Sequence, residues 1–236
     1  MAALAGAACS GAGADQATAD SANVAARSGA GNDSAPRSGS GRARRSTVVF
    51  LGTSLTAGLG LEPEEAFPAL LQERIDSAGL PFQVVNAGLS GETSAGALRR
   101  TDWLLRQPID VLVLETGAND GLRGLNVDST KVNIQSIISR VLAAKPAARI
   151  MLVQMEAPPN LGTAYTSRFR AMYPDLAREN GITLLPFLLE GVAGERALNQ
   201  NDGIHPTAEG SRRVTANLWP ALERELRAAA PPPAGH

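Results

Sequence analysis

The chain has 236 residues and an almost balanced charge, with 22 Lys and Arg against 23 Asp and Glu. This length suits one domain with or without a tail, and the balanced charge gives no reason to expect nucleic acid as a partner. The single cysteine, Cys9, excludes an intramolecular disulfide framework and a metal site built from several cysteines. No apolar run reaches the roughly 18 residues that are typical of a membrane-spanning helix.

Residues 1–9 end in Cys9 after small and apolar residues, and they resemble the end of a bacterial lipoprotein signal. The basic beginning and most of the apolar core of such a signal are missing, and Gly6 stands where leucine is usual. An Ala-rich start without a targeting role explains the same residues equally well. If Cys9 is lipidated, the protein is a periplasmic or membrane-anchored lipoprotein of a bacterium.

Composition changes near residue 47. Residues 10–46 are almost entirely Ala, Gly, Ser, Asp, Asn and Arg, without aromatic side chains. Such a segment buries too little apolar surface to offset its ordering entropy, so we predict a disordered linker. The folded domain is predicted to cover residues 47–227, followed by a flexible tail over 228–236.

From residue 47 onward, short apolar runs alternate with segments of helical spacing, several of them closed by glycine. In chain order we predict a strand at 48–51, a helix at 63–78, a strand at 82–85, a helix at 95–106, a strand at 109–114, a helix at 128–144, a strand at 149–154, a helix at 163–180, a strand at 182–185 and a helix at 206–227. This alternation predicts a three-layer α/β/α fold around a flavodoxin-like five-stranded parallel sheet.

The segment from Asp202 to Pro206 contains the only internal histidine, because the other histidine, His236, is the last residue. His205 is therefore the one internal imidazole available for proton transfer near neutral pH. Asp202 stands three residues earlier, close enough in a tight turn to orient the ring. By itself the segment is more typical of a solvated turn that leads into a helix with Pro206 at its start. An enzyme would need a nucleophile from elsewhere in the chain.

Polar loops that contain glycine follow the first three predicted strands, at residues 52–55, 86–92 and 115–121. The loop with Asp202 and His205 follows the fifth strand, so all four loops lie at the edge of the sheet where ligands bind in such folds. Each loop has an ordinary explanation as a helix cap or a turn. Together they supply a hydroxyl nucleophile, an imidazole base, a carboxylate and oxyanion donors, which are the groups that acyl transfer requires.

These four loops resemble the sequence blocks of the SGNH (GDSL) hydrolase family, and the resemblance covers residues 47–227. Residues 117–124, 184–187 and 202–206 are similar to the group of bacterial acyl-CoA thioesterases I, lysophospholipases L1 and arylesterases. The resemblance implies a triad of Ser54 as the nucleophile, His205 as the general base and then acid, and Asp202 as the carboxylate that orients the imidazole. It also implies a monomer that needs neither a metal nor an organic cofactor.

The resemblance further implies an oxyanion hole made by the backbone N–H groups of Ser54 and Gly88 and the side-chain amide of Asn119. Gly88 suits this role because a missing Cβ lets a substrate carbonyl approach the backbone. Asn119 suits it because a neutral amide donates a hydrogen bond without a competing proton equilibrium.

One residue departs from the family pattern, since Thr53 stands where the family usually has the Asp of Gly-Asp-Ser-Leu. Threonine forms hydrogen bonds but carries no charge, so we expect the triad to persist and leave open the rate and the rigidity of this loop. The α/β-hydrolases use the same residue types with a Gly-x-Ser-x-Gly motif. Around Ser90 that motif fails at Glu92, which favours Ser54 as the nucleophile.

The loops at residues 55–61 and 155–161 are mainly apolar and are expected to flank the substrate. This favours a small-molecule or lipid ester or thioester with an acyl chain. The candidate substrate-binding residues are Leu55, Leu59, Glu156 and Pro158. Two alternatives stay open: a carbohydrate O-deacetylase of the same fold, and a non-catalytic lipid-anchored binding protein.

Overall fold

The structure, a computed structural model, describes residues 45–230. The predicted signal remnant with Cys9 lies outside the described residues, as do nearly all of the predicted linker at 10–46 and most of the predicted tail at 228–236. In the described part, the first strand begins at Ser46 and the last helix ends at Ala229, two residues beyond the predicted end of the domain at 227. No helix within residues 45–230 is both long and apolar enough to cross a membrane.

Five parallel strands form one sheet in the order β2-β1-β3-β4-β5. This is the flavodoxin-like order, and it confirms the predicted fold class. β3 is buried at every position, as its uninterrupted apolar sequence requires of a central strand covered on both faces. The strands are β1 (Ser46–Gly52), β2 (Phe82–Gly88), β3 (Val111–Leu114), β4 (Arg149–Gln154) and β5 (Thr183–Phe187).

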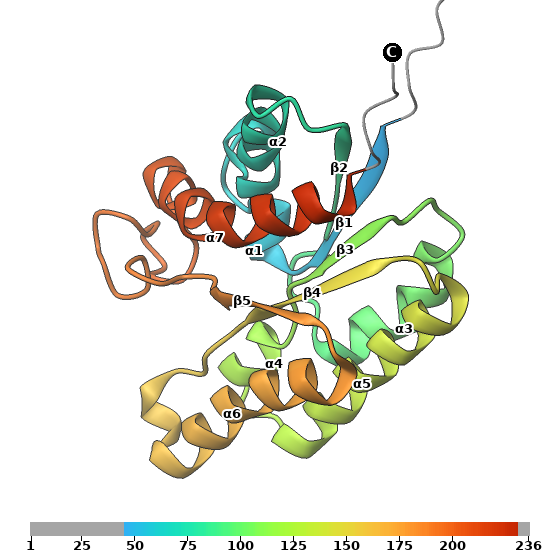
Figure 1. Ribbon diagram of the computed structural model, residues 1–236. Helices are drawn as coiled ribbons and strands as arrows, with labels where there is room; N and C mark the ends of the chain where they lie inside the picture. Colours follow the sequence, from blue (N-terminus) through green and yellow to red (C-terminus); the bar gives the residue numbers. More distant parts are fainter. Residues whose placement is uncertain (1–44, 231–236) are drawn as a thin grey trace, which may run out of the picture. The chain divides into compact units, whose positions relative to one another are not determined.

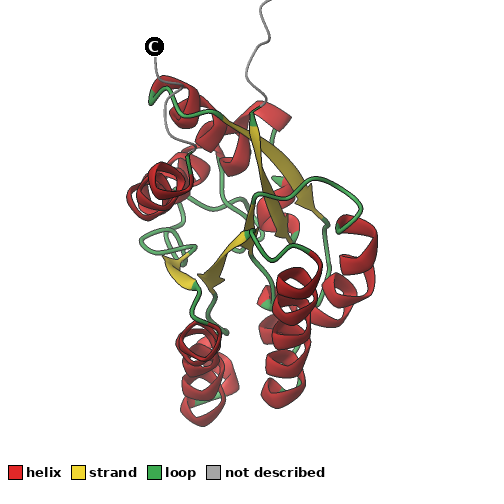
Figure 2. Ribbon diagram, turned by 45° about the vertical axis from the view of Figure 1, so that its right-hand side comes forward, coloured by secondary structure: helices red, strands yellow, loops and turns green. Residues whose placement is uncertain are grey.

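Helices cover both faces of the sheet, with α2 and α7 packed together on one face and α3, α5 and α6 on the other (Figure 1). Figure 2 shows the strands between these two helical layers. The α-helices are α1 (Ser54–Ala57), α2 (Phe67–Ser77), α3 (Ser94–Leu104), α4 (Ala118–Leu122), α5 (Val127–Ala144), α6 (Thr163–Asn180) and α7 (Ala208–Ala229), with 3₁₀ turns at Pro63–Glu65 and Pro159–Leu161.

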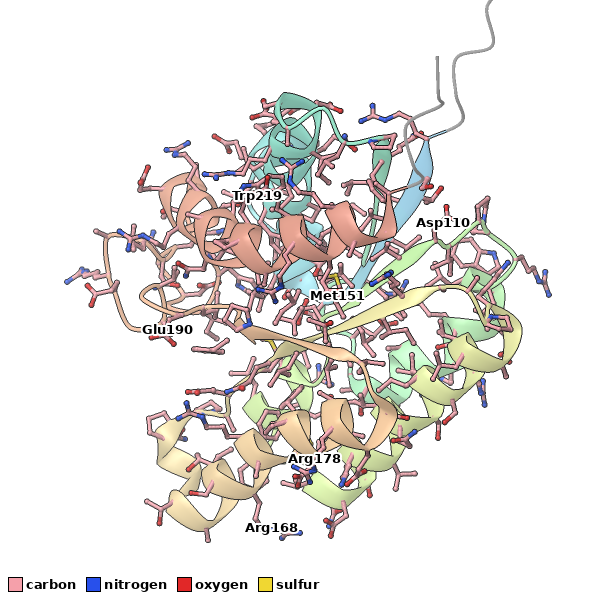
Figure 3. All side chains as sticks on the ribbon, in the orientation of Figure 1. Asp110, Met151, Arg168, Arg178, Glu190 and Trp219 are labelled. Carbon is pink, nitrogen blue, oxygen red and sulfur yellow. The ribbon has the colours of Figure 1, made fainter. Side chains whose placement is uncertain are left out.

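The apolar core lies on both faces of the sheet and is continuous through its central strands. Met151 of β4 lies in the middle of the molecule between the helical layers, whereas Arg168 and Arg178 project from the outer side of α6 (Figure 3). Burial of the strand side chains against the helices is the main favourable contribution to folding in such a domain. It also gives the loops at the strand ends a rigid support.

The predicted helix at 63–78 is in fact a 3₁₀ turn followed by α2, with Ala66 extended between them. The reason is Pro68, which has no N–H to donate to a preceding turn and therefore sits in the first turn of a new helix. The helices α1 and α4 lie in segments that we expected to be loops. Both are too short for a hydrophobic period to reveal them.

Candidate active site

Ser54 is the first residue of α1, directly after β1 and the N-cap residue Thr53. The Thr53 hydroxyl accepts the N–H of Leu55 at 3.3 Å, and Gly58 ends the helix in the left-handed conformation at φ 73°. This short turn places the Ser54 hydroxyl oxygen 2.8 Å from Nε2 of His205. The two residues are far apart in the sequence, so the fold rather than a local motif brings them together.

Asp202 and His205 form a compact hydrogen-bonded turn. One carboxylate oxygen of Asp202 lies 2.6 Å from Nδ1 of His205, and the other accepts the backbone N–H groups of Ile204 at 2.9 Å and His205 at 3.0 Å. Because an ionised carboxylate only accepts hydrogen bonds, Nδ1 carries the proton. Nε2 is then free to accept the hydrogen bond of the Ser54 hydroxyl, which is the arrangement that a general base requires.

The same hydrogen bonds keep Asp202 ionised. They lower the pKa of its carboxyl group to about 2, with the bond from the His205 side chain as the largest cause and the two backbone N–H groups next. The side chain is 46% exposed, so water also solvates the charge. A carboxylate in this state orients the imidazole without competing for its proton.

The loop that carries Asp202 and His205, residues 202–206, is called the histidine loop below. Gln200 connects it to the loop after α1 by hydrogen bonds. The Gln200 side-chain amide donates to the carbonyl of Leu59 at 2.7 Å and to that of Pro206 at 2.9 Å. The backbone N–H of Gln200 donates to the carbonyl of His205 at 2.7 Å. These bonds connect the two segments that carry the imidazole and the hydroxyl.

A buried carboxyl group, Glu115, lies on the protein side of the Ser54 turn. It directly follows β3, is 0% exposed, and accepts the backbone N–H of Thr53 at 2.8 Å, the Thr53 hydroxyl at 3.0 Å and the Thr56 hydroxyl at 2.9 Å. Burial raises the pKa of Glu115 to about 7, and the hydrogen bonds partly offset this shift. Thr53 replaces the aspartate that is usual in the family, and the turn with Ser54 is nevertheless held by hydrogen bonds to Glu115.

Gly88 has a different environment from the one predicted. Its backbone N–H already donates to the side-chain oxygen of Asn86 at 2.9 Å. A Cβ at this position would overlap the backbone of Thr56 and Ala57 in α1. Glycine is therefore needed here for the packing of α1 against β2, and its amide is not free for an oxyanion, which argues against the predicted role.

The backbone N–H groups of Ser54 and Gly91 donate to no acceptor within residues 45–230. Gly91 lies in the loop after β2 at φ 76°, a conformation that favours glycine. Asn119 is fixed beside this loop, because its side-chain amide donates to the carbonyl of Glu92 at 3.0 Å. The amide nitrogen of Asn119 has a second N–H, so three donors lie in the loops after β1, β2 and β3.

A mainly apolar cavity of about 340 Å³ lies where the loops after β3, β4 and β5 meet the histidine loop. Three of the four predicted substrate-binding residues, Leu55, Glu156 and Pro158, line it. The fourth, Leu59, lines a much smaller apolar cavity of about 10 Å³ beside Ser54 and His205. Further residues of the larger cavity are Ala118, Leu122, Met155, Ala157, Phe187 and Ile204.

A second hollow, of about 460 Å³, is formed by the loop after β2 and the start of α3, and we call it the cationic hollow. Arg100 is paired there with the buried Glu92 at 2.7 Å, and Arg123 donates to the carbonyl of Gly91 at 3.1 Å. The exposed side chain of Arg99 makes no ion pair within the described part of the chain. The cationic hollow therefore has a net positive charge.

The structure brings together Ser54, Asp202 and His205 and places Asn119 in a neighbouring loop, as the sequence predicted. Reasoning from the sequence missed Glu115 and chose Gly88 rather than Gly91. A charged residue directly after the apolar run of β3 was a signal for Glu115, since a carboxylate at a buried strand end needs hydrogen-bond donors. The choice between Gly88, the last residue of β2, and Gly91 in the following loop required the hydrogen-bond pattern of the folded chain.

Comparison with known proteins relates this site to a family. A model of the GDSL-like Lipase/Acylhydrolase family matches residues 50–213. Esterase TesA of Pseudomonas aeruginosa is 38% identical over 183 residues, which are 77% of this chain and 90% of that protein. Thioesterase 1/protease 1/lysophospholipase L1 of Escherichia coli K12 is 42% identical over 165 residues, which are 69% of this chain and 76% of that protein.

A solved structure supports the same relation. The crystal structure of TesA is similar with a TM-score of 0.72 and 38% identity, over 75% of this chain and 98% of that chain. The family match covers more than half of the sequence and includes the loops that carry Ser54 and Asn119 as well as the Asp202–His205 turn. The chain therefore belongs to the GDSL-like lipase/acylhydrolase family, the SGNH hydrolases, and is a hydrolase that acts on ester bonds.

Proposed function

We propose that this protein hydrolyses carboxylic esters or thioesters of acyl chains through a covalent acyl-enzyme on Ser54. The observation that carries the proposal is the continuous line of hydrogen bonds from Asp202 through His205 to the Ser54 hydroxyl, at 2.6 and 2.8 Å. The relatives named above are an esterase and a thioesterase and lysophospholipase, which supports the same class of substrate.

In the proposed mechanism, the Ser54 oxygen attacks the substrate carbonyl carbon while Nε2 of His205 takes the hydroxyl proton. The carbonyl π electrons move onto oxygen, and the oxyanion accepts hydrogen bonds from the amides of Ser54, Gly91 and Asn119. The oxyanion then re-forms the carbonyl, the bond to the leaving oxygen or sulfur breaks, and His205 donates its proton to the leaving group. Water repeats the sequence on the acyl-enzyme and releases the carboxylic acid.

The substitution Ser54→Ala tests this proposal directly. Hydrolysis of a p-nitrophenyl ester should fall by a factor of about 1,000 or more, because the nucleophile is lost while the oxyanion donors stay. A fluorophosphonate probe should label the unmodified protein and not the variant. Undiminished turnover by Ser54→Ala would refute the assignment, and absence of label on the unmodified protein would favour the non-catalytic binding alternative.

The larger apolar cavity, which is lined by Leu55 directly after Ser54 and by Ile204 directly before His205, supports an acyl chain as the substrate's acid part. Its volume of about 340 Å³ and its Leu, Met, Phe and Ile side chains suit a medium-length hydrocarbon chain. An octanoyl ester should therefore be hydrolysed with a higher kcat/KM than an acetyl ester of the same alcohol. A preference for acetyl would favour the carbohydrate O-deacetylase alternative.

The cationic hollow supports an anionic leaving group, such as the phosphate part of a lysophospholipid or of an acyl-CoA. Arg99 lines this hollow and forms no ion pair with any residue of the described part, 45–230, and guanidinium groups form charge-assisted hydrogen bonds with phosphate. We expect Arg99→Gln to raise KM about fivefold for a lysophosphatidylglycerol and to leave a monoacylglycerol of the same acyl chain unchanged. Arg168→Gln on the outer side of α6 is the matched control, and equal effects on both substrates would contradict this preference.

A further inference from the structure

Glu115 is a buried carboxyl group for which the mechanism above has no task. It is 0% exposed, and no lysine, arginine or histidine within residues 45–230 forms an ion pair with it. One oxygen, Oε2, accepts hydrogen bonds from one backbone N–H and two hydroxyl groups, and the Thr53 hydroxyl also lies 3.1 Å from Oε1. Burial of a carboxyl group without an ion pair costs stability because the group gives up its hydration. Its hydrogen bonds offset part of that cost, and the position of their donors indicates what else they do.

The three donors to Glu115 lie on both sides of the nucleophile. Thr53 supplies its backbone N–H at 2.8 Å and its hydroxyl at 3.0 Å, and Thr56 supplies its hydroxyl at 2.9 Å. All donors belong to the turn that contains Ser54, whereas the carboxyl group comes from the neighbouring strand β3. The carboxyl group therefore fixes the position of the nucleophile turn relative to the sheet.

The Thr53 hydroxyl links this carboxyl group to the start of α1. It donates to Glu115 and accepts the N–H of Leu55 at 3.3 Å. As a result the amides of Thr53 and Leu55 are both occupied, while the amide of Ser54 between them stays unoccupied. The pattern holds the backbone so that the free N–H and the hydroxyl of Ser54 are the groups left for chemistry.

Thr53 and Glu115 are chemically matched in this chain. The family usually has an aspartate at the position of Thr53, and an aspartate there would place a second carboxyl group against Glu115. Two carboxyl groups at hydrogen-bond distance share a proton, because both cannot be ionised at once. Threonine instead donates a hydrogen bond, so the single carboxyl group of Glu115 accepts all three donors that Thr53 and Thr56 present.

We propose that Glu115 is a positioning residue for Ser54, which acts through Thr53 and Thr56 to hold the hydroxyl against His205 and to keep the Ser54 amide free. This inference rests on the proposed role of Ser54 as the nucleophile. Burial raises the pKa of Tyr173 of α6 well above its ordinary value, and the charges of Glu115 and of Asp120 in α4 raise it further. Tyr173 donates to the carbonyl of Thr116 at 2.9 Å, and Asp120 accepts from Ser94 and Thr130.

The first test uses Glu115→Leu, which leaves a side chain of similar length and removes both acceptor oxygens, because a glutamine could still accept all three bonds through one oxygen. We expect kcat for p-nitrophenyl butyrate to fall about 100-fold, the cost of a nucleophile displaced from its reactive geometry, with KM within twofold. The rate of fluorophosphonate labelling should fall by the same factor. The pH profile of kcat/KM should lose the ionisation of Glu115 near pH 7. Folding is checked by the thermal unfolding midpoint, with assays well below it.

The second test keeps the inference falsifiable if Glu115→Leu does not fold. Thr53→Val should lower kcat about tenfold because it removes the hydroxyl that links Glu115 to Leu55, and Thr53→Ser should restore the original rate. Thr53→Asp should add an ionisation to the pH profile. Thr101→Val, which removes a buried hydroxyl hydrogen bond inside α3, is the matched control and should leave kcat unchanged.

The outcomes separate this inference from the proposed function. If fluorophosphonate fails to label Ser54 in the unmodified protein, the proposed function fails. If Ser54 is labelled and Glu115→Leu and Thr53→Val keep the original kcat and labelling rate while unfolding at lower temperature, Glu115 is only a stabilising residue. That second result would overturn the positioning role and leave the hydrolase mechanism intact.

Discussion

Two carboxyl groups flank the nucleophile turn, and their surroundings shift their pKa values in opposite directions. Asp202 faces solvent beside His205, where hydrogen bonds from the imidazole and two backbone N–H groups lower its pKa to about 2. Glu115 lies on the buried side of Ser54, where loss of hydration raises its pKa to about 7. Three donor groups serve each carboxyl group, so burial rather than the number of donors makes the difference.

This contrast indicates how the two sides of the site are used. The exposed carboxylate stays charged over the whole range in which proteins work, and it can stabilise the imidazolium that forms during acyl transfer. The buried carboxyl group holds structure, and its charge can change near neutral pH. Environments that shift the pKa values of two neighbouring carboxyl groups in opposite directions are characteristic of active sites.

Among substitutions of the two carboxyl groups and their hydrogen-bond partners, Asp202→Asn is expected to have the largest effect on activity. The amide presents a donor to Nδ1 of His205 and favours the wrong tautomer, so kcat/KM for a p-nitrophenyl ester should fall about 10,000-fold. The thermal unfolding midpoint should change little, because the side chain is half exposed. A loss of less than tenfold would show that the Asp202 carboxylate does not orient His205.

Glu115→Ala should have the next largest effect, and on stability rather than only on rate. It leaves three donors of the nucleophile turn without an acceptor in a buried place, at a cost of about 1 to 3 kcal/mol each, so unfolding by urea should require at least about 3 kcal/mol less. Glu209→Ala, at an exposed residue of α7 that pairs with Arg212, is the control and should stay within about 0.5 kcal/mol. Equal losses would mean that Glu115 is not an essential acceptor.

A third difference should appear in the pH dependence of stability. Because the folded protein holds the Glu115 proton up to about pH 7 and the unfolded chain loses it near pH 4.5, this group makes the free energy of unfolding decrease as pH rises between these values. The decrease is on the order of 3 kcal/mol. Urea unfolding of the original protein and of Glu115→Gln at several pH values between these limits isolates it, since the variant lacks the ionisation.

Asp202 should show the opposite sign in the same experiment. Its folded pKa lies below its ordinary value of 3.8, so its contribution to stability is present above pH 3.8 and is lost as pH falls through about 2. The two carboxyl groups therefore act in separate pH ranges. If the original protein and Glu115→Gln have parallel stability curves between pH 4.5 and 7, the opposite shifts described here do not exist.

The smallest effect is expected from Thr56→Val, which removes one of the hydroxyl donors to Glu115 and keeps the shape of the side chain. The free energy of unfolding should fall by about 1 kcal/mol, the net contribution of one hydrogen bond. Thr56→Ser retains the donor and should lose less. A larger loss in the Ser variant than in the Val variant would indicate that packing, and not the bond to Glu115, decides the role of Thr56.

The contact between Asp202 and His205, on the exposed side of the site, could be predicted from the sequence because the two residues are close along the chain. Asp202 and His205 are three residues apart, and a turn of that length brings their side chains together whatever the rest of the chain does. The helix predicted at 163–180 has the same bounds in the structure, since its periodicity and the glycine that ends it lie within one segment. Both features depend on neighbours along the chain.

The buried side was not open to prediction in the same way. Glu115 and Thr53 are 62 residues apart, and neither residue type indicates the other. Gly88 and Gly91 stand three positions apart in similar surroundings, and only the packing of α1 against Gly88 and the bond from its amide to Asn86 distinguish them. The two hollows likewise combine loops from different strands.

The sequence by itself determined the alternation of strands and helices, the parallel sheet and the Asp202–His205 pair. These follow from periodicity, turn chemistry and spacing over a few residues, whereas the expectation that Ser54 is the nucleophile came from the resemblance to the family. Only the tertiary structure decided that Glu115 supports the Ser54 turn and that the Gly91 amide, rather than that of Gly88, is free. The physical reason is the parallel register of the central strands, which aligns Leu51 with Leu114 and Gly52 with Gly88 and so brings the ends of distant segments to one edge.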